Sequence, residues 1–161
     1  MSSPHLHIGT RNEFHDALRT AFAEIADVGC REVWLCDDDF ADWPLNERAV
    51  VENLTRWAKS HRKLTLIART FEEFAGRYPR WIEWRRQWSH VVECRSLAEA
   101  EAGDLPVLLL APGVVTVRLF DAVNYRGSVS HDVADEVQNR ELVDAVLQRS
   151  IEAFPATILG L

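Results

Sequence analysis

The sequence predicts an α/β protein in which a mixed β-sheet is flanked by helices on both faces. Three observations lead to this prediction: amphipathic helical patterns alternate with short apolar runs of strand length, a hairpin pattern follows them, and a long helical pattern comes last. A chain of 161 residues with 47% apolar content is large enough for one domain with its own core. We therefore expect residues 1–161 to form a single domain, with roughly the first ten residues extended or frayed.

The first part of the chain contains two helical and two strand patterns. Residues 11–27 have apolar side chains at helical spacing. The runs "EVWLCD" (32–37) and "KLTLIA" (63–68) are continuous, apolar and short, which is typical of buried strands. Between them, 45–59 resumes the helical period, with Asn46 as a candidate N-cap. The apolar stripe of the first helix consists of Phe14, Leu18, Ala21, Phe22 and Ile25.

The second part of the chain continues this alternation. In chain order we expect a short helix at 71–78, a helix beginning at Pro79, a strand at 91–95, a helix at 96–103 capped by Ser96, a hairpin at 106–120 that turns at Pro112-Gly113, and a helix at 132–153. The apolar residues of the last helix are Val137, Leu142, Val143, Val146, Leu147 and Ile151.

Cysteine usage and the absence of long apolar segments indicate a cytoplasmic protein. Cys30, Cys36 and Cys94 are an odd number without a C-x-x-C pair, which disfavours a disulfide framework and a thiolate metal site. The N-terminus lacks a basic segment followed by an apolar run, and no apolar stretch approaches the ~20 residues that span a bilayer. We expect no membrane partner and no cofactor.

Charge is unevenly distributed along the chain, whose net charge is −7. Residues 56–95 contain ten Lys or Arg and four Glu, a balance of +6, whereas the flanking segments sum to −13. This distribution creates either a surface that attracts anions or ion pairs between the basic segment and its flanks. We favour the ion pairs, because such networks are common in folded proteins.

The segment "YPRWIEWRRQWSH" (78–90) combines three tryptophans with three arginines and a histidine. The tryptophans are Trp81, Trp84 and Trp88. Their spacing places them on one helical face, and such a stripe is more often part of a core than a cofactor platform. Arg85 lies within the same arc, so its guanidinium must stack on an aromatic ring or meet a carboxylate. We expect the tryptophans to be buried and Arg85 to pair with an aspartate of 37–39.

The same segment also has a functional interpretation. Arginines interleaved with aromatic residues suit a phosphate, a nucleotide or a single nucleic-acid strand, which they bind through bidentate contacts and stacking. Arg80, Arg85 and Arg86 then supply the contacts, and His90 follows at the entrance of the next strand. We expect Arg80 and Arg86 at the rim of the structure.

An acidic cluster, "DDD" at 37–39, follows the first buried strand. Ligands of open α/β sheets gather at such carboxyl ends, and Mg²⁺ uses one or two carboxylates there. Neighbouring side chains of an extended chain point in opposite directions, so Asp37 and Asp39 are the candidates for a metal. Aspartates after a strand more often cap turns, and we favour that interpretation.

Other catalytic patterns are absent from the sequence. It contains no G-x-S-x-G elbow, Walker loop, dinucleotide fingerprint or H-E-x-x-H motif. His5 and His7 share one face of an extended terminus, where they can bind a metal weakly, but a frayed terminus is the better interpretation.

The run "VVTVRLFDAVNYRGSVSHDVADEVQNRELVDAVLQRSIEAFP" (114–155) resembles the closing half of a phospholipase D-type domain, in which a strand hairpin leads to a Gly-Ser pair and then to a long helix. The opening is similar too, with a helix, a strand such as "EVWLCDDDF" (32–40), a second helix and "KLTLIAR" (63–69). The resemblance extends over 11–155. It implies a single phospholipase D-like half-domain of bacterial type.

In active members of this family the hairpin carries H-x-K-x(4)-D, whose histidine is the nucleophile and whose lysine binds phosphate. The family's usual spacing, counted back from the Gly-Ser pair (127–128), places these roles at Gly113, Val115 and Phe120. A shift of one residue supplies Asp121 for the acid but neither a histidine nor a lysine. The resemblance therefore implies a degenerate domain that has lost the family's chemistry.

The resemblance also bears on ligands and assembly. The asparagine that usually follows the Gly-Ser pair is missing, because 129–131 are Val, Ser and His. Arg118, Ser128 and His131 are the polar residues nearest to the vanished site, but we favour their ordinary explanations, which are an exposed strand position, a turn and a helix cap respectively. Active members of the family that consist of a single half form twofold dimers. The resemblance therefore also implies a homodimer.

Two functions remain open from the sequence. The first, which we favour, is a noncatalytic module that binds an anionic, phosphate-bearing ligand such as nucleic acid, or a protein partner. The alternative is a phosphodiester or phosphate-ester hydrolase with a site outside the family pattern, formed by Asp37 and Asp39 with a divalent metal or by His90 with Arg86.

Overall fold

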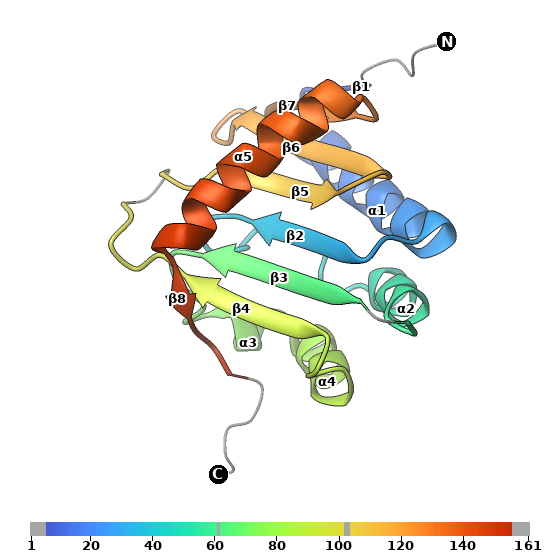
Figure 1. Cartoon of the computed structure of the whole chain (residues 1–161), viewed down its shortest axis with the longest axis vertical. Coiled ribbons are helices and arrows are strands. Elements are labelled where there is room, and N and C mark those ends of the chain that lie inside the picture. The colour runs from blue at the N-terminus through green and yellow to red at the C-terminus, as the bar shows by residue number, and fades with distance from the viewer. Residues whose placement is uncertain (1–5, 61, 102–103, 156–161) are drawn as a thin grey trace.

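The computed structural model describes residues 6–60, 62–101 and 104–155, which form an α/β fold around one eight-stranded sheet (Figure 1). The strands are β1 (Leu6–Ile8), β2 (Glu32–Cys36), β3 (Lys63–Ala68), β4 (Val92–Ser96), β5 (Val107–Ala111), β6 (Val115–Asp121), β7 (Arg126–Ser130) and β8 (Ile151–Glu152). The helices are α1 (Arg11–Val28), α2 (Arg48–Trp57), α3 (Phe74–Arg77), α4 (Pro79–Gln87) and α5 (Val133–Arg149). The predicted fold class is confirmed.

The sheet is mixed, with the strand order β1-β7-β6-β5-β2-β3-β4-β8. β2, β3 and β4 run parallel to one another, and helices connect them, as parallel neighbours require. β5, β6 and β7 are antiparallel, and β1 adds antiparallel to β7. β8 pairs with β4, so the first and last strands lie at opposite edges of the sheet (Figure 1).

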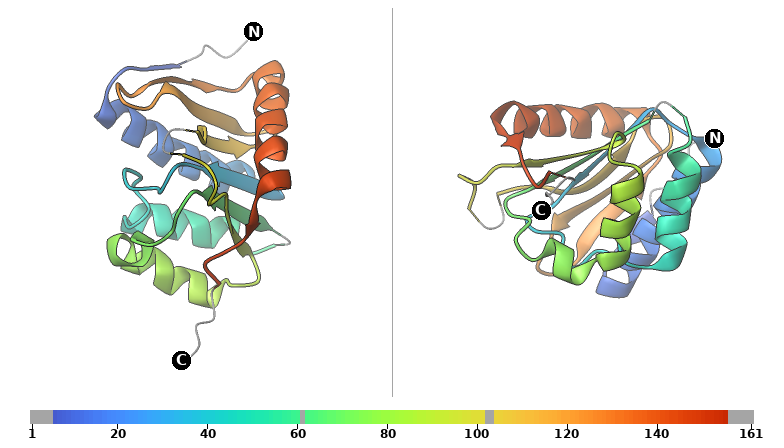
Figure 2. Two further views of the ribbon diagram at one scale, coloured as in Figure 1. Left: turned by 90° about the vertical axis from the view of Figure 1, so that its left-hand side faces the viewer. Right: turned by 90° about the horizontal axis from the view of Figure 1, so that it is seen from below.

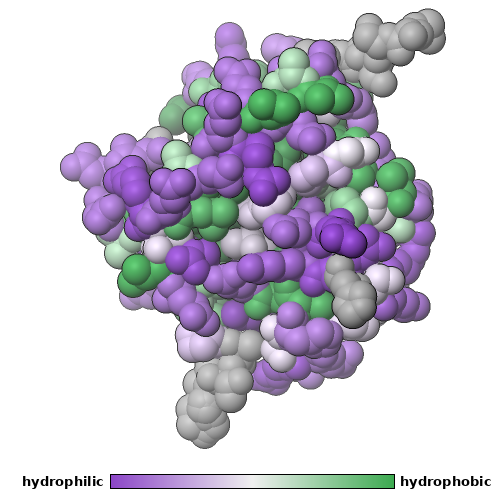
Figure 3. All heavy atoms as spheres, in the orientation of Figure 1, coloured by the Kyte–Doolittle hydropathy of each residue, from purple (hydrophilic) through white to green (hydrophobic). Residues whose placement is uncertain are grey.

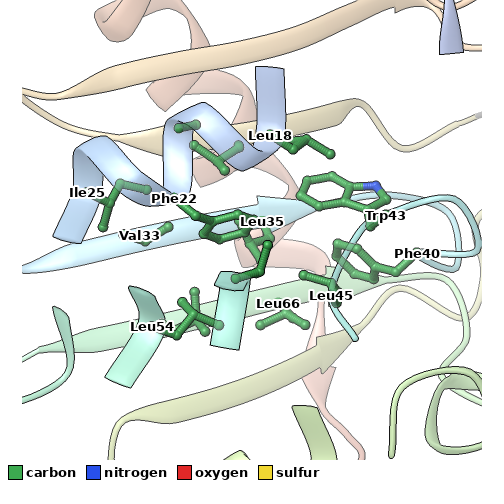
Figure 4. Close-up of a cluster of buried hydrophobic side chains, with 14 of the residues drawn as sticks. Leu18, Phe22, Ile25, Val33, Leu35, Phe40, Trp43, Leu45, Leu54 and Leu66 are labelled. Atoms are coloured by element: carbon green, nitrogen blue, oxygen red, sulfur yellow. The ribbon is translucent and has the colours of Figure 1, made fainter. Parts of the chain in front are cut away.

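Helices cover both faces of the sheet. α1 to α4 lie on one face, and α5 crosses the other face alone (Figure 2). The larger apolar cluster lies under α1, α2 and α4; in its centre Phe22 and Leu54 surround Val33 and Leu35 of β2 (Figure 4). A smaller cluster under α5 includes Val143. Central strands with both faces covered are apolar throughout, which explains the continuous runs in the sequence.

α1 agrees closely with its prediction. All five residues of the predicted stripe are buried. The side chain of Thr10 caps the first turn by accepting a hydrogen bond from the backbone N–H of Glu13 at 3.1 Å. Gly29 ends the helix with φ 83°, a conformation that suits glycine.

Residues 6–8 and the hairpin are also part of the sheet. Residues 6–8 form β1, so the favoured interpretation of a frayed terminus is wrong for them and the extended alternative is observed. His5 lies outside the described residues. The hairpin is confirmed as β5 and β6, with Gly113 at φ 79° in the turn. The sequence pattern did not reveal β7, which contains Gly127 and Ser128.

α5 differs from the predicted helix at 132–153. It ends earlier, and Ile151 instead pairs with Ser96 at the sheet edge. Among its predicted apolar residues, Val143 is buried but Val137 is 53% exposed. A single helix on a sheet face buries only a narrow stripe, so the surface seen from this side is largely hydrophilic with isolated apolar spots (Figure 3).

Two predicted helix caps are wrong. Ser96 is the last residue of β4; its hydroxyl donates to the carbonyl of Arg69 at 2.9 Å, and 97–101 contains no helix. Asn46 does not cap α2. Its side-chain oxygen accepts a hydrogen bond at 2.7 Å from the backbone N–H of Arg80, in the first turn of α4. In both cases the polar side chain forms its hydrogen bond with a residue that is distant in the sequence.

None of the helices within the described ranges combines the length and hydrophobicity needed to span a bilayer.

Candidate anion-binding site

The aromatic segment of α4 belongs to the core. Trp81 is fully buried and Trp84 is 4% exposed. Their rings lie 5.8 Å apart, and Trp81 also packs against Phe74 at 5.1 Å between centroids. Trp88 is partly buried against the same cluster. The stripe is therefore a packing surface, as its helical spacing predicted.

Arg85 is buried but has no carboxylate partner, which corrects the expected pair with an aspartate of 37–39. Only 5% of the residue is exposed, and no described residue forms an ion pair with it. Its guanidinium lies over the ring of Phe154, 5.0 Å from the centroid, and its Nε has no hydrogen-bond partner. Burial lowers the pKa of Arg85. Of the two expected alternatives, aromatic stacking is the one observed.

The other polar residues of this segment lie apart from one another. Arg80 is exposed and donates to the carbonyl of Asn46 at 2.9 Å. Arg86 is exposed and pairs with Glu83 at 3.0 Å. His90 is exposed beside the ring of Trp88, and no contact between described residues joins it to Arg86. Arg80 and Arg86 thus lie at the rim as expected, but no shared site forms here.

Most cations of the basic segment 56–95 are already paired. Arg56 pairs with Asp27 and Arg69 with Asp38, so the expected pairing with the flanking segments is present in part. The pairs within the segment are Lys63–Glu93, Arg77–Glu73, Arg86–Glu83 and Arg95–Glu93. The positive balance of the sequence therefore does not become an open basic surface.

The acidic cluster caps its own turn. The carboxylate of Asp37 accepts hydrogen bonds from the backbone N–H groups of Asp39 and Phe40, at 3.1 and 2.7 Å. Asp39 in turn accepts from the backbone N–H of Ala41 at 3.0 Å. Burial raises the pKa of Asp37. In the described part of the chain, no three His, Cys, Asp or Glu side chains are grouped to hold a metal ion.

The structure assembles a different polar site on the α5 side of the sheet. A cavity of about 380 Å³ lies beside the antiparallel strands and α5. The residues with polar side chains that its strands contribute are His7 of β1, Thr116 and Arg118 of β6, and Arg126, Ser128 and Ser130 of β7. β1, which is distant in the sequence, therefore meets the neighbouring strands β6 and β7 in one cavity.

Strand register explains how these residues meet. Arg118 pairs with Ser128 across β6 and β7, and Thr116 pairs with Ser130. His7 pairs with Ser128 from the other side of β7. Cross-strand partners project from the same face of a sheet, so His7, Ser128 and Arg118 form one row across three strands.

Gly127 allows β6 and β7 to approach closely at this row. A Cβ atom at position 127 would lie 1.9 Å from the carbonyl oxygen of Arg118, closer than any real contact of this kind. The glycine of the Gly-Ser pair thus has a packing role, and it places Ser128 opposite Arg118.

The positions obtained by counting family spacing do not coincide with this row. Gly113 lies in the β5–β6 turn, and Val115 is 3% exposed in the core. Phe120 lines the cavity. The β6 residues opposite Ser130 and Ser128 are instead Thr116 and Arg118. The β6–β7 ladder also contains an irregularity between Leu119 and Asp121 that the sequence spacing does not reveal.

Two arginines give the cavity its positive charge. Arg118 donates to the side-chain oxygen of Asn139 at 3.1 Å, and its Nε has no hydrogen-bond partner. Burial lowers the pKa of Arg118. No carboxylate among the described residues forms an ion pair with Arg118. Arg126 lies opposite Asp121 across β6 and β7; hydrogen bonds from Asn124 lower the pKa of that carboxyl, and the charge of Arg126 contributes to the lowering. Asp135 also lines the cavity, and the hydroxyl of Ser130 donates to it at 2.6 Å.

His131 does not belong to this cavity. It follows Ser130 by one residue, so it projects toward the opposite side, where its Nε2 lies 3.0 Å from a carboxylate oxygen of Glu24 in α1. It does not cap α5 either, because Asp132 is the cap and accepts from the backbone N–H of Ala134 at 2.9 Å. The structure thus brings Arg118 and Ser128 together and separates His131 from them.

His7, Thr116 and Arg126 line the cavity although they were not among the site residues predicted from the sequence. The alternation T-x-R-x-F at 116–120 was a local signal that these side chains share one strand face. Nothing local connects His7 to Ser128, because their pairing depends on a sheet contact between strands that are distant in the sequence.

Comparisons with known proteins agree with this architecture. No protein-family model and no curated protein sequence matches the chain. Among solved structures, it is similar over 93% of its length to NucT from Helicobacter pylori (TM-score 0.58, 11% identity, 99% of that chain). It is also similar over 93% of its length to Nuc from Salmonella typhimurium, a phospholipase D family member (TM-score 0.53, 8% identity, 99% of that chain). The fold is therefore that of phospholipase D-like nuclease structures, as the sequence resemblance implied.

A third similar structure is TrmBL2, described as an archaeal chromatin protein with a novel mode of DNA binding. The TM-score is 0.64 with 15% identity, and the match covers 94% of the present chain. The chain spans about half of TrmBL2, because the match covers 54% of that protein. At these identities, the likeness concerns the fold alone.

Proposed function

We propose that this chain is a noncatalytic phospholipase D-like module that binds a phosphate-bearing anion in the cavity beside β6, β7 and α5. The observation that carries the proposal is the placement of Arg118, which forms no ion pair with any described carboxylate, in one cavity with Arg126 and the hydroxyl of Ser128. Guanidinium groups and hydroxyls are preferred partners of phosphate oxygens. The degenerate motif of the hairpin is part of this proposal.

The residue types in the cavity support binding rather than cleavage. The β6 residues opposite Ser130 and Ser128 are a threonine and an arginine, and the hairpin contains neither a histidine nor a lysine. Arg118 can hold a phosphate, but Thr116 has no adjacent base that would make its hydroxyl a nucleophile among the contacts of the described residues.

Isothermal titration with inorganic phosphate and ribose 5-phosphate, at two salt concentrations, tests the binding. We expect affinity to fall with salt, and Arg118→Gln to weaken binding by about tenfold or more, because a charge-assisted contact is lost. Arg86→Gln is the matched control, since this exposed arginine pairs with Glu83 outside the cavity. Equal affinities of the wild type and Arg118→Gln would contradict the proposal.

A parallel assay with bis(p-nitrophenyl) phosphate, with and without Mg²⁺, tests the absence of catalysis. We expect no turnover. Turnover that disappears in His7→Ala would show that the imidazole in the cavity is reactive and would overturn the noncatalytic assignment. Turnover that disappears in Asp37→Asn or His90→Ala would instead support one of the alternative hydrolase sites. In the structure Asp37 accepts from the backbone of Asp39, and His90 contacts the ring of Trp88.

We also propose a homodimer that uses the N-terminal half of α5. Val133 and Val137 are 69% and 53% exposed, and their spacing places them on one helical face. Twofold dimers are the commonest assemblies of identical chains. Light scattering after gel filtration should give a dimer mass for the wild type and a monomer mass for Val137→Lys; a monomeric wild type would refute the proposal.

A further inference from the structure

Phe120 is an exposed aromatic residue at the candidate site. The residue is 68% exposed although it lies within β6, and its ring lines the same cavity as Arg118 and Ser128. Side chains alternate along a strand, so Phe120 shares the cavity face with Thr116 and Arg118. Exposure of a large aromatic ring to water forgoes the stabilisation that its burial would give. Such a ring at the edge of a polar cavity therefore indicates an interaction surface.

The contacts of Arg118 hold the ring and the positive charge in a fixed relationship. The guanidinium lies 5.2 Å from the centroid of Phe120, and the same guanidinium donates to Asn139 of α5. The cationic group therefore lies over one face of the ring and is itself held by α5, and the remaining exposed face of Phe120 is available to a ligand. Gln138, exposed on α5, adds a side-chain amide that can donate and accept at the cavity wall.

From this arrangement we infer that the ligand of the cavity is a phosphate that carries a nucleobase, with the base stacked on Phe120 and the phosphate held by Arg118, Arg126 and Ser128. The inference rests on the proposed function and specifies its ligand class. Bases stack readily on exposed aromatic rings that flank a cationic groove. Inorganic phosphate or a phosphorylated sugar makes no use of such a ring.

The size of the cavity is compatible with this class. Its volume of about 380 Å³ lies in the range of pockets that hold small ligands. The same base–phosphate unit occurs in free nucleotides and in single-stranded nucleic acid, so the experiment includes both sources.

The experiment compares ribose 5-phosphate with AMP, two ligands that differ by the base, in isothermal titrations of the full chain. For the wild type we expect AMP to bind about tenfold more tightly than ribose 5-phosphate, because stacking of one base on one aromatic ring contributes an affinity gain of this size. Phe120→Leu should abolish this tenfold difference between AMP and ribose 5-phosphate, whatever its effect on the affinity that the two ligands share. Arg118→Gln should lower the affinities for AMP and for ribose 5-phosphate to a similar extent.

Each outcome separates the inference from the proposed function. If ribose 5-phosphate binds but AMP binds no better, or if Phe120→Leu leaves the difference intact, the inferred ligand class is wrong while anion binding stands. If neither ligand binds, the proposed function itself fails. Because Phe120 is exposed, thermal melting of Phe120→Leu should match the wild type, which ensures that a lost difference is not a folding defect.

The two ligand sources are distinguished by a third titration with a short single-stranded oligo(dA). An affinity at least tenfold above that of AMP assigns the site to single-stranded nucleic acid, because successive bases and phosphates then contribute. An affinity equal to that of AMP assigns it to a free nucleotide. Both results support the inferred class, whereas binding of the oligonucleotide that is insensitive to Phe120→Leu argues against it.

Discussion

The guanidinium of Arg85 lies 5.0 Å from the centroid of the Phe154 ring, and this contact takes the place of the carboxylate that a buried arginine usually has. The contact joins α4 to the segment that follows β8. Phe154 also stacks on Phe71 at 5.4 Å and meets Phe74 at 5.8 Å, so the cation closes one side of an aromatic cluster.

Replacing this cation with an apolar side chain should not harm the fold. Arg85→Met should leave the free energy of unfolding unchanged or raise it by about 1–2 kcal/mol, because it removes a buried charge without a carboxylate and keeps the packed volume. Urea unfolding measures this effect. Trp81→Ala, in the same helix, is the contrasting variant and should lose about 3–5 kcal/mol. A loss above about 1 kcal/mol in Arg85→Met would show that the cation–ring contact stabilises more than its burial costs.

The capping of α4 by a residue outside the helix can be tested at Asn46. Asn46→Ala should lower the free energy of unfolding by about 1 kcal/mol, because the backbone N–H of Arg80 loses its acceptor. Asn53→Ala is the control. Asn53 lies within α2 and accepts only from the side chain of Arg56, so this change should be neutral or slightly stabilising. If Asn46→Ala and Asn53→Ala lowered the stability equally in thermal unfolding, this would argue against a capping role of Asn46.

The close approach of β6 and β7 predicts an asymmetry between two glycines. Gly127→Ala should lower the free energy of unfolding by about 1–3 kcal/mol, since its Cβ would lie 1.9 Å from the Arg118 carbonyl and the strands must move apart. Gly76→Ala meets no atom within 4 Å and should be neutral or stabilising by about 0.5–1 kcal/mol, because alanine favours the helix. Chemical denaturation of both variants measures the difference. Similar values for the two would contradict the predicted clash.

Asp42 should make the stability of the protein sensitive to acid. Burial by itself raises the pKa of its carboxyl, but hydrogen bonds from Tyr125, Arg11 and His15 outweigh burial and hold the pKa below the usual 3.8. The folded state therefore binds the proton more weakly than the unfolded state. The resulting stability is present above pH 3.8 and is lost as the pH falls through the lower, folded-state pKa.

Asp42→Asn should consequently lower the free energy of unfolding by about 1–2 kcal/mol at neutral pH, where charge-assisted hydrogen bonds are lost. The difference from the wild type should narrow as the pH falls below 3.8, because Asp42 of the unfolded wild-type chain takes up a proton there and the folded carboxylate loses its charge at its lower pKa. Urea unfolding at a series of pH values measures this. Asp16→Asn, which removes an exposed partner of Arg19, serves as the control. A difference that stays constant down to low pH would contradict the prediction.

The predictions that succeeded from sequence rest on local patterns. The stripe from Phe14 to Ile25 and the apolar runs of β2 and β3 specify which side chains leave water, and burial follows from that pattern whatever the neighbouring elements are. The burial of the tryptophans of α4 also follows from their helical spacing. The likeness to phospholipase D-like structures could also be anticipated, because the order of helices and strands is a property of the chain itself.

By itself, then, the sequence determined the secondary structure of the central elements, the class of fold and the absence of a histidine and a lysine from the hairpin. Tertiary structure alone decided that Arg85 meets Phe154 rather than an aspartate, that Asn46 caps α4, and that His7, Ser128 and Arg118 stand in one row. The physical reason is that a polar side chain takes whichever partner the folded chain brings within hydrogen-bonding reach, and strand register between distant segments sets that partner.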